Sequence, residues 1–189
     1  MKNYLTKTEE QKWYQNLNEM FTETKDILFK LGYKEVYDNK YNIQIKNLGT
    51  KSLAICEFRG RDYFDDEKLF NISFNSNYLA FAKKEQIKNT MMHEMIHSLD
   101  GCMSHTGRWK QIATRINYSL PQYQIKRTTD PGEEFYKNVV EKQYKYEIEC
   151  NKCHSKWRYQ RMTKTIQSCS KGTAICSCGS KDFKVTVLK

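Results

Sequence analysis

The chain has 189 residues and a mass of 22.6 kDa, with 39% hydrophobic residues, 29% charged residues and a mean hydropathy of −0.83. It holds no run of about 18 apolar residues and no apolar signal segment, so we expect an intracellular protein, cytoplasmic or nucleoid-associated, and neither a membrane protein nor a secreted one. The 32 basic residues outnumber the 22 acidic ones, which favours a polyanionic partner such as nucleic acid, although a solvated basic surface explains the same count.

The first half of the chain predicts one long helix followed by three strands. Apolar residues at helical spacing indicate a helix from Thr6 to Leu31, with a capping box of Thr8 and Gln11 and with Gly32 as its C-cap. Alternating apolar and polar residues then mark strands at about 41–45, 53–58 and 69–74. A small antiparallel sheet is the simplest arrangement of these strands.

Two shorter helices follow, at about 85–99 and 107–117, with Thr106 as a candidate N-cap of the second. An extended piece near 123–127 and a connector over 133–145, which can be helical, come next. Residues 141–189 then hold 11 basic and 4 acidic residues and five of the seven cysteines, whereas the first 140 residues hold 21 basic and 18 acidic ones. This change of composition predicts two domains, 1–140 and 141–189.

The segment His93-Glu94-Met95-Ile96-His97 is an HExxH motif within the helix at 85–99. One helical turn separates the two histidines, so both imidazoles can reach one Zn²⁺. Glu94 would take a proton from zinc-bound water, which attacks a carbonyl, and pass it to the leaving amine. Two surface histidines are the plain alternative. The apolar helix and the crowding of three of the four histidines into 13 residues argue against it.

A third ligand must come from outside that helix, and His105 is the best candidate. A metzincin would have glycine at position 100 and histidine at 103, where this chain has Asp100 and Met103. A gluzincin would use a downstream glutamate, and Glu133 or Glu134 is the weaker alternative. Three histidines and a water favour zinc over manganese or iron.

Residues near the motif carry weaker hypotheses. Asp100 shares a helix face with His97 and can orient its ring, although a helix-end carboxylate is the better-supported interpretation. Cys102 and Met103 suggest thiol regulation, but their apolar neighbours favour a packing role.

The cysteines of the last 40 residues predict a zinc ribbon, because two close pairs about 20 residues apart have strand-like flanks at 144–149 and 183–188. The favoured ligands of this structural zinc are Cys150, Cys153, Cys176 and Cys178. The second pair is CxC and not CxxC, which leaves Cys169 as an alternative ligand and His154 as a more remote one.

Cations and aromatic residues interleave in the ribbon, at Lys152, Lys156, Trp157, Arg158, Arg161 and Lys164. Cations contact phosphates and aromatic rings stack on unpaired bases, so this segment predicts binding of DNA that is single-stranded or has single-stranded character. An ordinary ribbon face with a packed Trp157 is the alternative.

The stretch MMHEMIHSLDGCMSHTGRWKQIATRIN resembles the SprT-like (Spartan-type) metalloprotease family, known for HExxH, a third histidine followed closely by glycine and an aromatic residue, and a helix ending near RIN. The matching residues are His93, Glu94, His97, His105, Gly107, Trp109 and Arg115 to Asn117, with Thr106 between the third histidine and the glycine where the family usually has HG.

The resemblance runs from about residue 5 to the end and implies an α+β minimal gluzincin-like domain (N-terminal helix, small antiparallel sheet, HExxH helix) followed by a small β zinc ribbon. It implies a catalytic zinc on the three histidines, Glu94 as general base and acid, and a structural zinc. Because eukaryotic Spartan proteins act on DNA–protein crosslinks, it also implies an endopeptidase whose substrate is DNA-bound protein. A non-catalytic DNA-binding or adaptor zinc protein, and a metal-dependent hydrolase of another substrate class, are the alternatives.

Overall fold

The computed structural model describes residues 4–63 and 66–188, and the chain divides into two compact units, Met1–Phe135 and Tyr136–Lys189. The division falls five residues before the position expected from composition. Each unit has a small sheet with helices, so the predicted α+β class is confirmed. Among the described residues, no helix is both long and apolar enough to cross a lipid bilayer.

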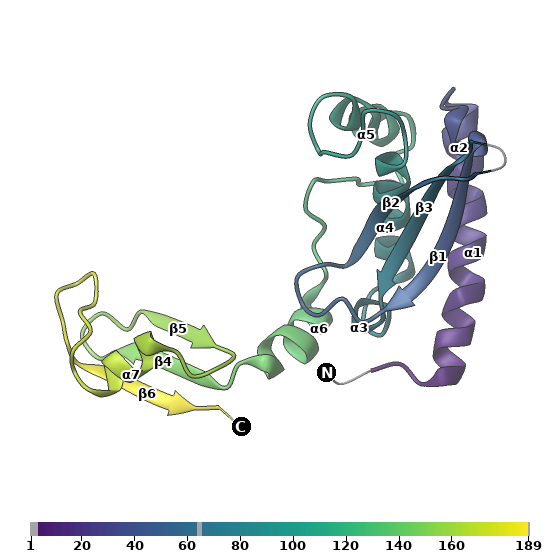
Figure 1. The fold of residues 1–189 in the computed structure, drawn as a ribbon. Coiled ribbons are helices and arrows are strands. Elements are labelled where there is room, and N and C mark those ends of the chain that lie inside the picture. Colours follow the sequence, from purple (N-terminus) through teal and green to yellow (C-terminus); the bar gives the residue numbers. More distant parts are fainter. Residues whose placement is uncertain (1–3, 64–65, 189) are drawn as a thin grey trace. The chain divides into compact units, whose positions relative to one another are not determined.

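The first unit holds most of the helices and a mixed sheet (Figure 1). In chain order its elements are α1 (Lys7–Lys30), α2 (Glu35–Asp38), β1 (Asn39–Lys46), β2 (Ala54–Arg61), β3 (Lys68–Asn75), α3 (Ser76–Leu79), α4 (Lys84–His97), α5 (Arg108–Ser119) and α6 (Glu133–Phe135).

The helix α1 begins within one residue of the predicted start, but its N-cap lies two residues before the predicted one. Thr6 is the N-cap: its hydroxyl accepts the Glu9 N–H at 3.3 Å, and the Glu9 carboxylate accepts the Thr6 N–H at 2.8 Å. The expected box of Thr8 and Gln11 is wrong because Thr8 already lies inside the helix. At the other end Leu31 is the C-cap, and Gly32 follows it with φ 96°, a conformation that glycine adopts readily.

The sheet has the order β1-β3-β2, in which β3 pairs with β2 antiparallel and with β1 parallel. The prediction of an antiparallel sheet is therefore right for one strand pair and wrong for the other. Alternation of apolar residues specifies which side of each strand is buried, but it carries no information on which strands are neighbours. In the observed order β1-β3-β2, β2 lies at an edge of the sheet.

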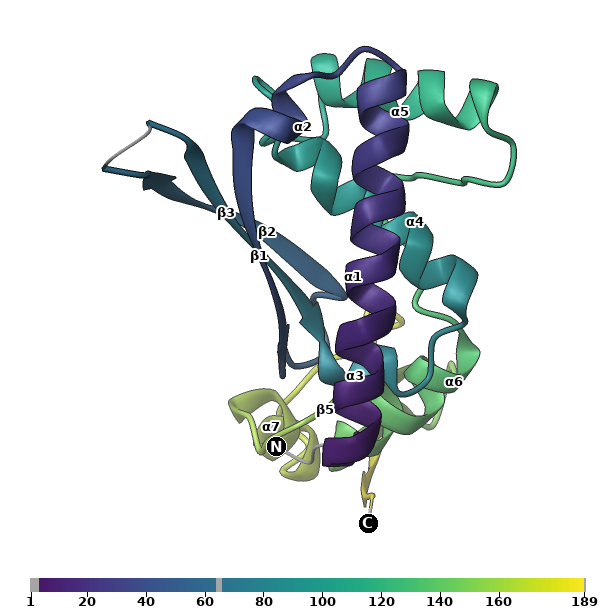
Figure 2. The same ribbon diagram turned by 90° about the vertical axis from the view of Figure 1, so that its right-hand side faces the viewer.

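One face of this sheet is covered by helices: α1 packs on β1 and α4 packs on β2 (Figure 2). The central strand contributes Phe70, Ile72 and Phe74 to the core between these layers. Burial of such side chains supplies most of the stabilising free energy of the unit. It also places the second half of α4, which carries the HExxH motif, beside the edge strand.

Two predicted details after α4 need correction. Gly107, with φ 54°, is the N-cap residue of α5, and Thr106 instead hydrogen-bonds Ser104 through the two hydroxyls at 2.9 Å. The predicted extended piece is an irregular strap over residues 123–127, held by side chains and not by a sheet. Helical turns η1 (Tyr136–Val140) and η2 (Glu141–Gln143) occupy most of the connector that follows.

The second unit is a three-stranded antiparallel sheet of β4 (Tyr146–Cys150), β5 (Lys156–Tyr159) and β6 (Phe183–Val187), with β4 in the centre. The helix α7 (Lys164–Ser170), which the sequence did not predict, closes one face. Ile148, Ile166 and Cys169 form the small core.

Asn75, fully buried at the end of β3, ties down the loop that leads into β2. Its amide donates to the carbonyls of Gly49 and Ser52 at 2.9 and 2.8 Å. We expect Asn75→Ala to lower the free energy of unfolding by about 2 kcal/mol, because the half-buried Gly49 and Ser52 carbonyls lose their donor. Urea unfolding measures this. Asn42→Ala, at an exposed position of β1, is the control and should change little; equal effects of the two variants would contradict the assignment.

Candidate metal centres

The imidazoles of His93, His97 and His105 converge at the end of α4. His93 and His97 lie one helical turn apart, α4 ends at His97, and the following loop brings His105 back. The three Nε2 atoms are separated by 3.3 Å (93 to 97), 3.1 Å (97 to 105) and 2.8 Å (93 to 105). Tetrahedral zinc with Zn–N bonds of about 2.0–2.1 Å holds its nitrogens roughly 3.3 Å apart. The cluster therefore fits such an ion.

Backbone carbonyls fix the orientation of two of these rings. His93 Nδ1–H donates to the Lys126 carbonyl at 2.9 Å, and His97 Nδ1–H donates to the Cys102 carbonyl at 2.7 Å. Each bond leaves the Nε2 lone pair free for a metal. Burial, followed by the neighbouring imidazoles, lowers the pKa of His93 to about 4, so the ring is neutral near pH 7.

The strap over 123–127 is held by two asparagines, a role that the sequence alone did not indicate. Asn117 on α5 donates to the Ile125 carbonyl at 2.9 Å and accepts the Ile125 N–H at 2.8 Å, and Asn89 on α4 accepts the Gln124 N–H at 2.8 Å. These bonds place the next carbonyl, that of Lys126, at the His93 ring. Backbone groups carry no side-chain signature, so only the fold reveals them.

Trp109 on α5 packs against all three imidazoles. Its ring centroid lies 4.8 Å from that of His93, 5.6 Å from that of His97 and 4.8 Å from that of His105. The side chain is 3% exposed, so it forms an apolar floor under the rings and limits their rotation. The helix-face position read from the sequence places Trp109 in the core; its contact with the imidazoles is a finding of the structure.

Glu94 is buried beside the histidines and lines the same cleft. Burial raises the pKa of its carboxyl to about 7, and a hydrogen bond with the Cys56 backbone opposes the shift. The cleft has a volume of about 350 Å³ and is lined by residues 51–56 on and before β2, by α4, by Met103 and His105, and by residues 127–129. A cation on the histidines would favour the ionised carboxylate.

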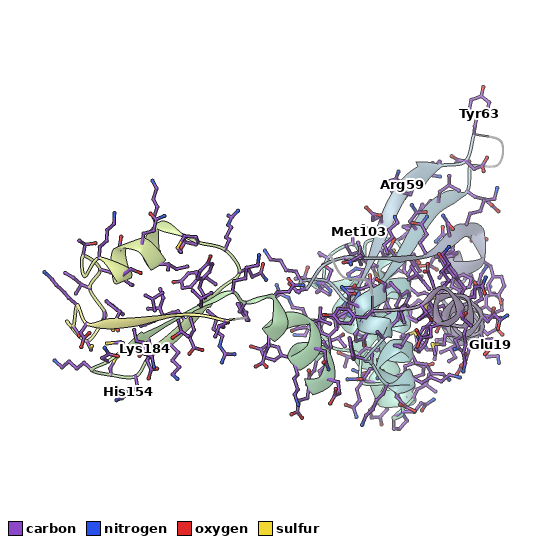
Figure 3. The ribbon with its side chains drawn as sticks, turned by 90° about the horizontal axis from the view of Figure 1, so that it is seen from below. Glu19, Arg59, Tyr63, Met103, His154 and Lys184 are labelled. Carbon is purple, nitrogen blue, oxygen red and sulfur yellow. The ribbon has the colours of Figure 1, made fainter. Side chains whose placement is uncertain are left out.

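The weaker hypotheses around the motif are settled by contacts. The Asp100 carboxylate pairs with Lys68 and not with His97, as expected for a helix-end carboxylate. Cys102 is buried and orients His97 through its backbone, while Met103 is 57% exposed at the cleft (Figure 3). Glu133 and Glu134 lie on α6, outside the histidine cluster, and the side chain that joins His93 and His97 is that of His105.

The second cluster lies in the second unit and consists of Cys150, Cys153, Cys176 and Cys178, whose sulfurs are all within 4.8 Å of one another. The Sγ atoms of Cys150 and Cys178 are 3.7 Å apart, and those of Cys153 and Cys176 are 3.6 Å apart. These distances exceed a disulfide bond and match roughly 3.8 Å for tetrahedral Zn–S bonds of about 2.3 Å. Hydrogen bonds with Ser155 lower the pKa of Cys153 to about 6, which favours the thiolate.

Two similar turns present these sulfurs. The residue after each cysteine pair has a positive φ, 57° at His154 and 82° at Gly179. The N–H of each donates at 2.8 Å to the carbonyl of the first cysteine of its pair. The CxC pair thus closes in the same way as the CxxC pair, and its shorter spacing does not require a ligand from elsewhere.

The alternative ligands lie outside this cluster. Cys169 packs with Ile148 and Ile166 in the core of the unit. His154 interacts through Nδ1 with Glu149 at 3.3 Å, and Figure 3 shows it with Lys184 on the side of the ribbon away from α7.

Three of the predicted DNA-binding residues of the ribbon lie on β5, where they divide between its two faces. Lys156 and Arg158 lie opposite Glu149 and Glu147 on β4 and form ion pairs with them, at 3.3 and 2.8 Å. Trp157 points to the other face, where it is 39% exposed and contacts Phe183. The remaining cations, Lys152, Arg161 and Lys164, make no ion pair within residues 4–63 and 66–188. Alternation along the strand therefore separates the cations from the tryptophan.

We expect Asn117→Ala to weaken metal binding by the histidine cluster roughly tenfold, because the carbonyl that orients His93 is no longer fixed. Titration with Co²⁺ while Zn²⁺ occupies the thiolate cluster measures this site by its d–d absorption, and the absence of a sulfur-to-cobalt charge-transfer band shows that the cysteines hold no cobalt. Asn117→Asp keeps the acceptor for Ile125 and should have a smaller effect. Gln111→Ala, exposed on the same helix, is the control. Unchanged metal affinity in Asn117→Ala would show that the strap keeps its position without the hydrogen bonds of Asn117.

Cysteine variants distinguish ligands from core residues. We expect Cys176→Ala to lose the metal of the ribbon and unfold the second unit, because metal binding supplies much of the folding free energy of so small a module. Cys169→Ala should keep the metal and lower stability by only about 1 kcal/mol. Mass spectrometry of the intact chain measures the metal content of both variants. Loss of metal in Cys169→Ala alone would reverse the assignment.

Comparison with known proteins agrees with the histidine cluster and with the first unit that holds it. A search of curated proteins gave no match. The model of the SprT-like family matches residues 10–129, which spans α1, the sheet, the HExxH helix and the strap, and leaves the ribbon outside. This match covers more than half of the chain and includes every residue of the histidine cluster, so the protein belongs to the SprT-like family.

Proposed function

We propose that this chain is a zinc-dependent endopeptidase. The observation that carries the proposal is a buried carboxylate, Glu94, beside three converging imidazoles in an open cleft. His93, His97 and His105 would hold the catalytic zinc, and the four cysteines a structural one. When bound, the catalytic zinc supplies a Lewis acid at the scissile carbonyl and makes water more nucleophilic.

The residues of the chain account for proton transfer and substrate orientation. Glu94 takes a proton from the attacking water and delivers it to the nitrogen of the leaving amine, so that one carboxylate acts as base and then as acid. Residues 54–56 of the edge strand β2 line the cleft. An extended peptide can add to the outer edge of β2, beside the Cys56 backbone group that bonds Glu94, and backbone hydrogen bonds there would carry its carbonyl to the histidines. Unstructured segments are therefore the expected substrates.

We expect Glu94→Gln to lower kcat by roughly 10²–10⁴-fold with zinc retained, because the amide cannot accept the proton. Cleavage of an unstructured protein, with zinc content measured in parallel, provides the test. Chelation should abolish wild-type cleavage and added zinc should restore it. Glu57→Gln, on the same edge strand but not lining the cleft, is the matched control. Full activity in Glu94→Gln would contradict the proposed role.

We further infer that the substrate is protein bound or crosslinked to DNA. The excess of ten basic residues and the resemblance to Spartan-type proteins support this. We expect wild type to cleave a DNA-binding protein faster with single-stranded DNA than without it. Cleavage that ignores DNA would remove the nucleic-acid role and keep the peptidase. No cleavage of any protein, with zinc present, would favour the non-catalytic alternative.

A further inference from the structure

One surface of the first unit is positively charged, and of its cations Arg108 pairs with a carboxylate, that of Glu35. Residues 101–129 contain five basic residues and no aspartate or glutamate, and they form the loop after α4, the helix α5 and the strap. Lys110, Lys126 and Arg127 are exposed and make no ion pair in the described part of the chain. On β5 of the ribbon, by contrast, Lys156 and Arg158 are paired with glutamates.

Two hollows follow one another along α5 on this surface. The first, of about 630 Å³, lies between α5 and the strap and shares His105 and Arg127 with the metal cleft. Its lining includes the buried side chains of Trp109 and Ile125, and Lys110 and Lys126 stand on its two sides. It therefore combines an apolar lining with a cationic rim.

The second hollow, of about 690 Å³, continues along α5 and shares Gly107, Lys110 and Thr114 with the first. Its lining adds Arg115 and Tyr118. Arg115 stacks on Tyr33 at 5.7 Å and has no carboxylate partner among residues 4–63 and 66–188, and Tyr118 is 89% exposed. From Lys110 to Tyr118 the helix rises about 12 Å, a length that a short run of nucleotides spans.

We propose that these hollows over α5 form a binding track for single-stranded nucleic acid that begins at the metal cleft. The cations are spread along two adjoining hollows. This spacing suits the regularly spaced charges of a phosphate backbone better than it suits a ligand with a single carboxylate. The solvent-exposed ring of Tyr118 provides a stacking platform for an unpaired base. The proposal rests on the proposed function and deepens it, because it places the nucleic acid on the metalloprotease unit, next to the bond to be cleaved.

The test uses the full zinc-loaded chain and a fluorescent single-stranded oligothymidine, with affinity measured by anisotropy. We expect Lys110→Gln combined with Tyr118→Ala to bind roughly tenfold more weakly, since one phosphate contact and one stacked base are lost. The slope of log affinity against log salt should fall by about 0.7. Lys12→Gln combined with Tyr63→Ala is the matched control, because Lys12 is exposed on α1 and Tyr63 projects from the tip of the β2–β3 hairpin (Figure 3).

Several outcomes would overturn the track. The first is unchanged binding by the α5 variant. The second is loss of binding only in a ribbon variant that combines Lys152→Gln with Lys164→Gln. The third is displacement of the oligonucleotide by polyglutamate at equal charge concentration. Cleavage of an unstructured peptide without DNA separates this proposal from the peptidase. Wild type that cleaves nothing, while the α5 variant loses binding, supports the track and removes the peptidase. Intact cleavage with unchanged DNA binding removes only the track.

Discussion

Two hydrogen bonds between imidazoles and backbone carbonyls hold the histidine cluster together. The Lys126 and Cys102 carbonyls fix His93 and His97, and both carbonyls belong to irregular segments. Each segment is anchored in turn. Asn89 and Asn117 hold the strap, while Arg108 bridges the Asp100 carbonyl and the Glu35 carboxylate at 2.6 Å each and so ties down the loop before His105. The site therefore depends on α5 and α2 as much as on the helix that carries the motif.

This dependence explains what the sequence could and could not predict. The spacing of His93 and His97 and the cysteine pairs have periodic or motif-like signatures, and the expected donors come together in the structure. The parallel pairing of β1 with β3 and the helix α7 have no such signature, because strand order and coverage of a small sheet are decided by tertiary packing. The roles of the Lys126 and Cys102 carbonyls could not be predicted for a simpler reason: every residue has a backbone carbonyl, so the sequence does not mark these two.

Counting charges and locating them lead to different conclusions. By count, the excess of basic residues lies mainly in residues 141–189. By contact, Lys156 and Arg158 are neutralised by Glu149 and Glu147 across the β4–β5 pair, where opposite charges on facing strands stabilise the sheet. The first unit has a smaller net excess, but on α5 and the strap it concentrates Lys110, Arg115, Lys126 and Arg127, which have no carboxylate partner among the residues that the structure describes. A polyanion responds to the local field at its own contact distance, because salt screens charges beyond about 10 Å.

The two clusters also differ in how many donors they offer, and this difference separates their chemistry. Four thiolates complete a tetrahedral shell, so an ion among the cysteines has no position left for a substrate, and its role is confined to folding. Three imidazoles leave one position open, and that position lies in a cleft lined by Glu94 and an edge strand. If the histidine cluster were only structural, the buried Glu94 carboxylate would lower stability without binding the metal, because burial of an ionisable group costs free energy. The role proposed for Glu94, transfer of a proton from the attacking water, would account for its presence there.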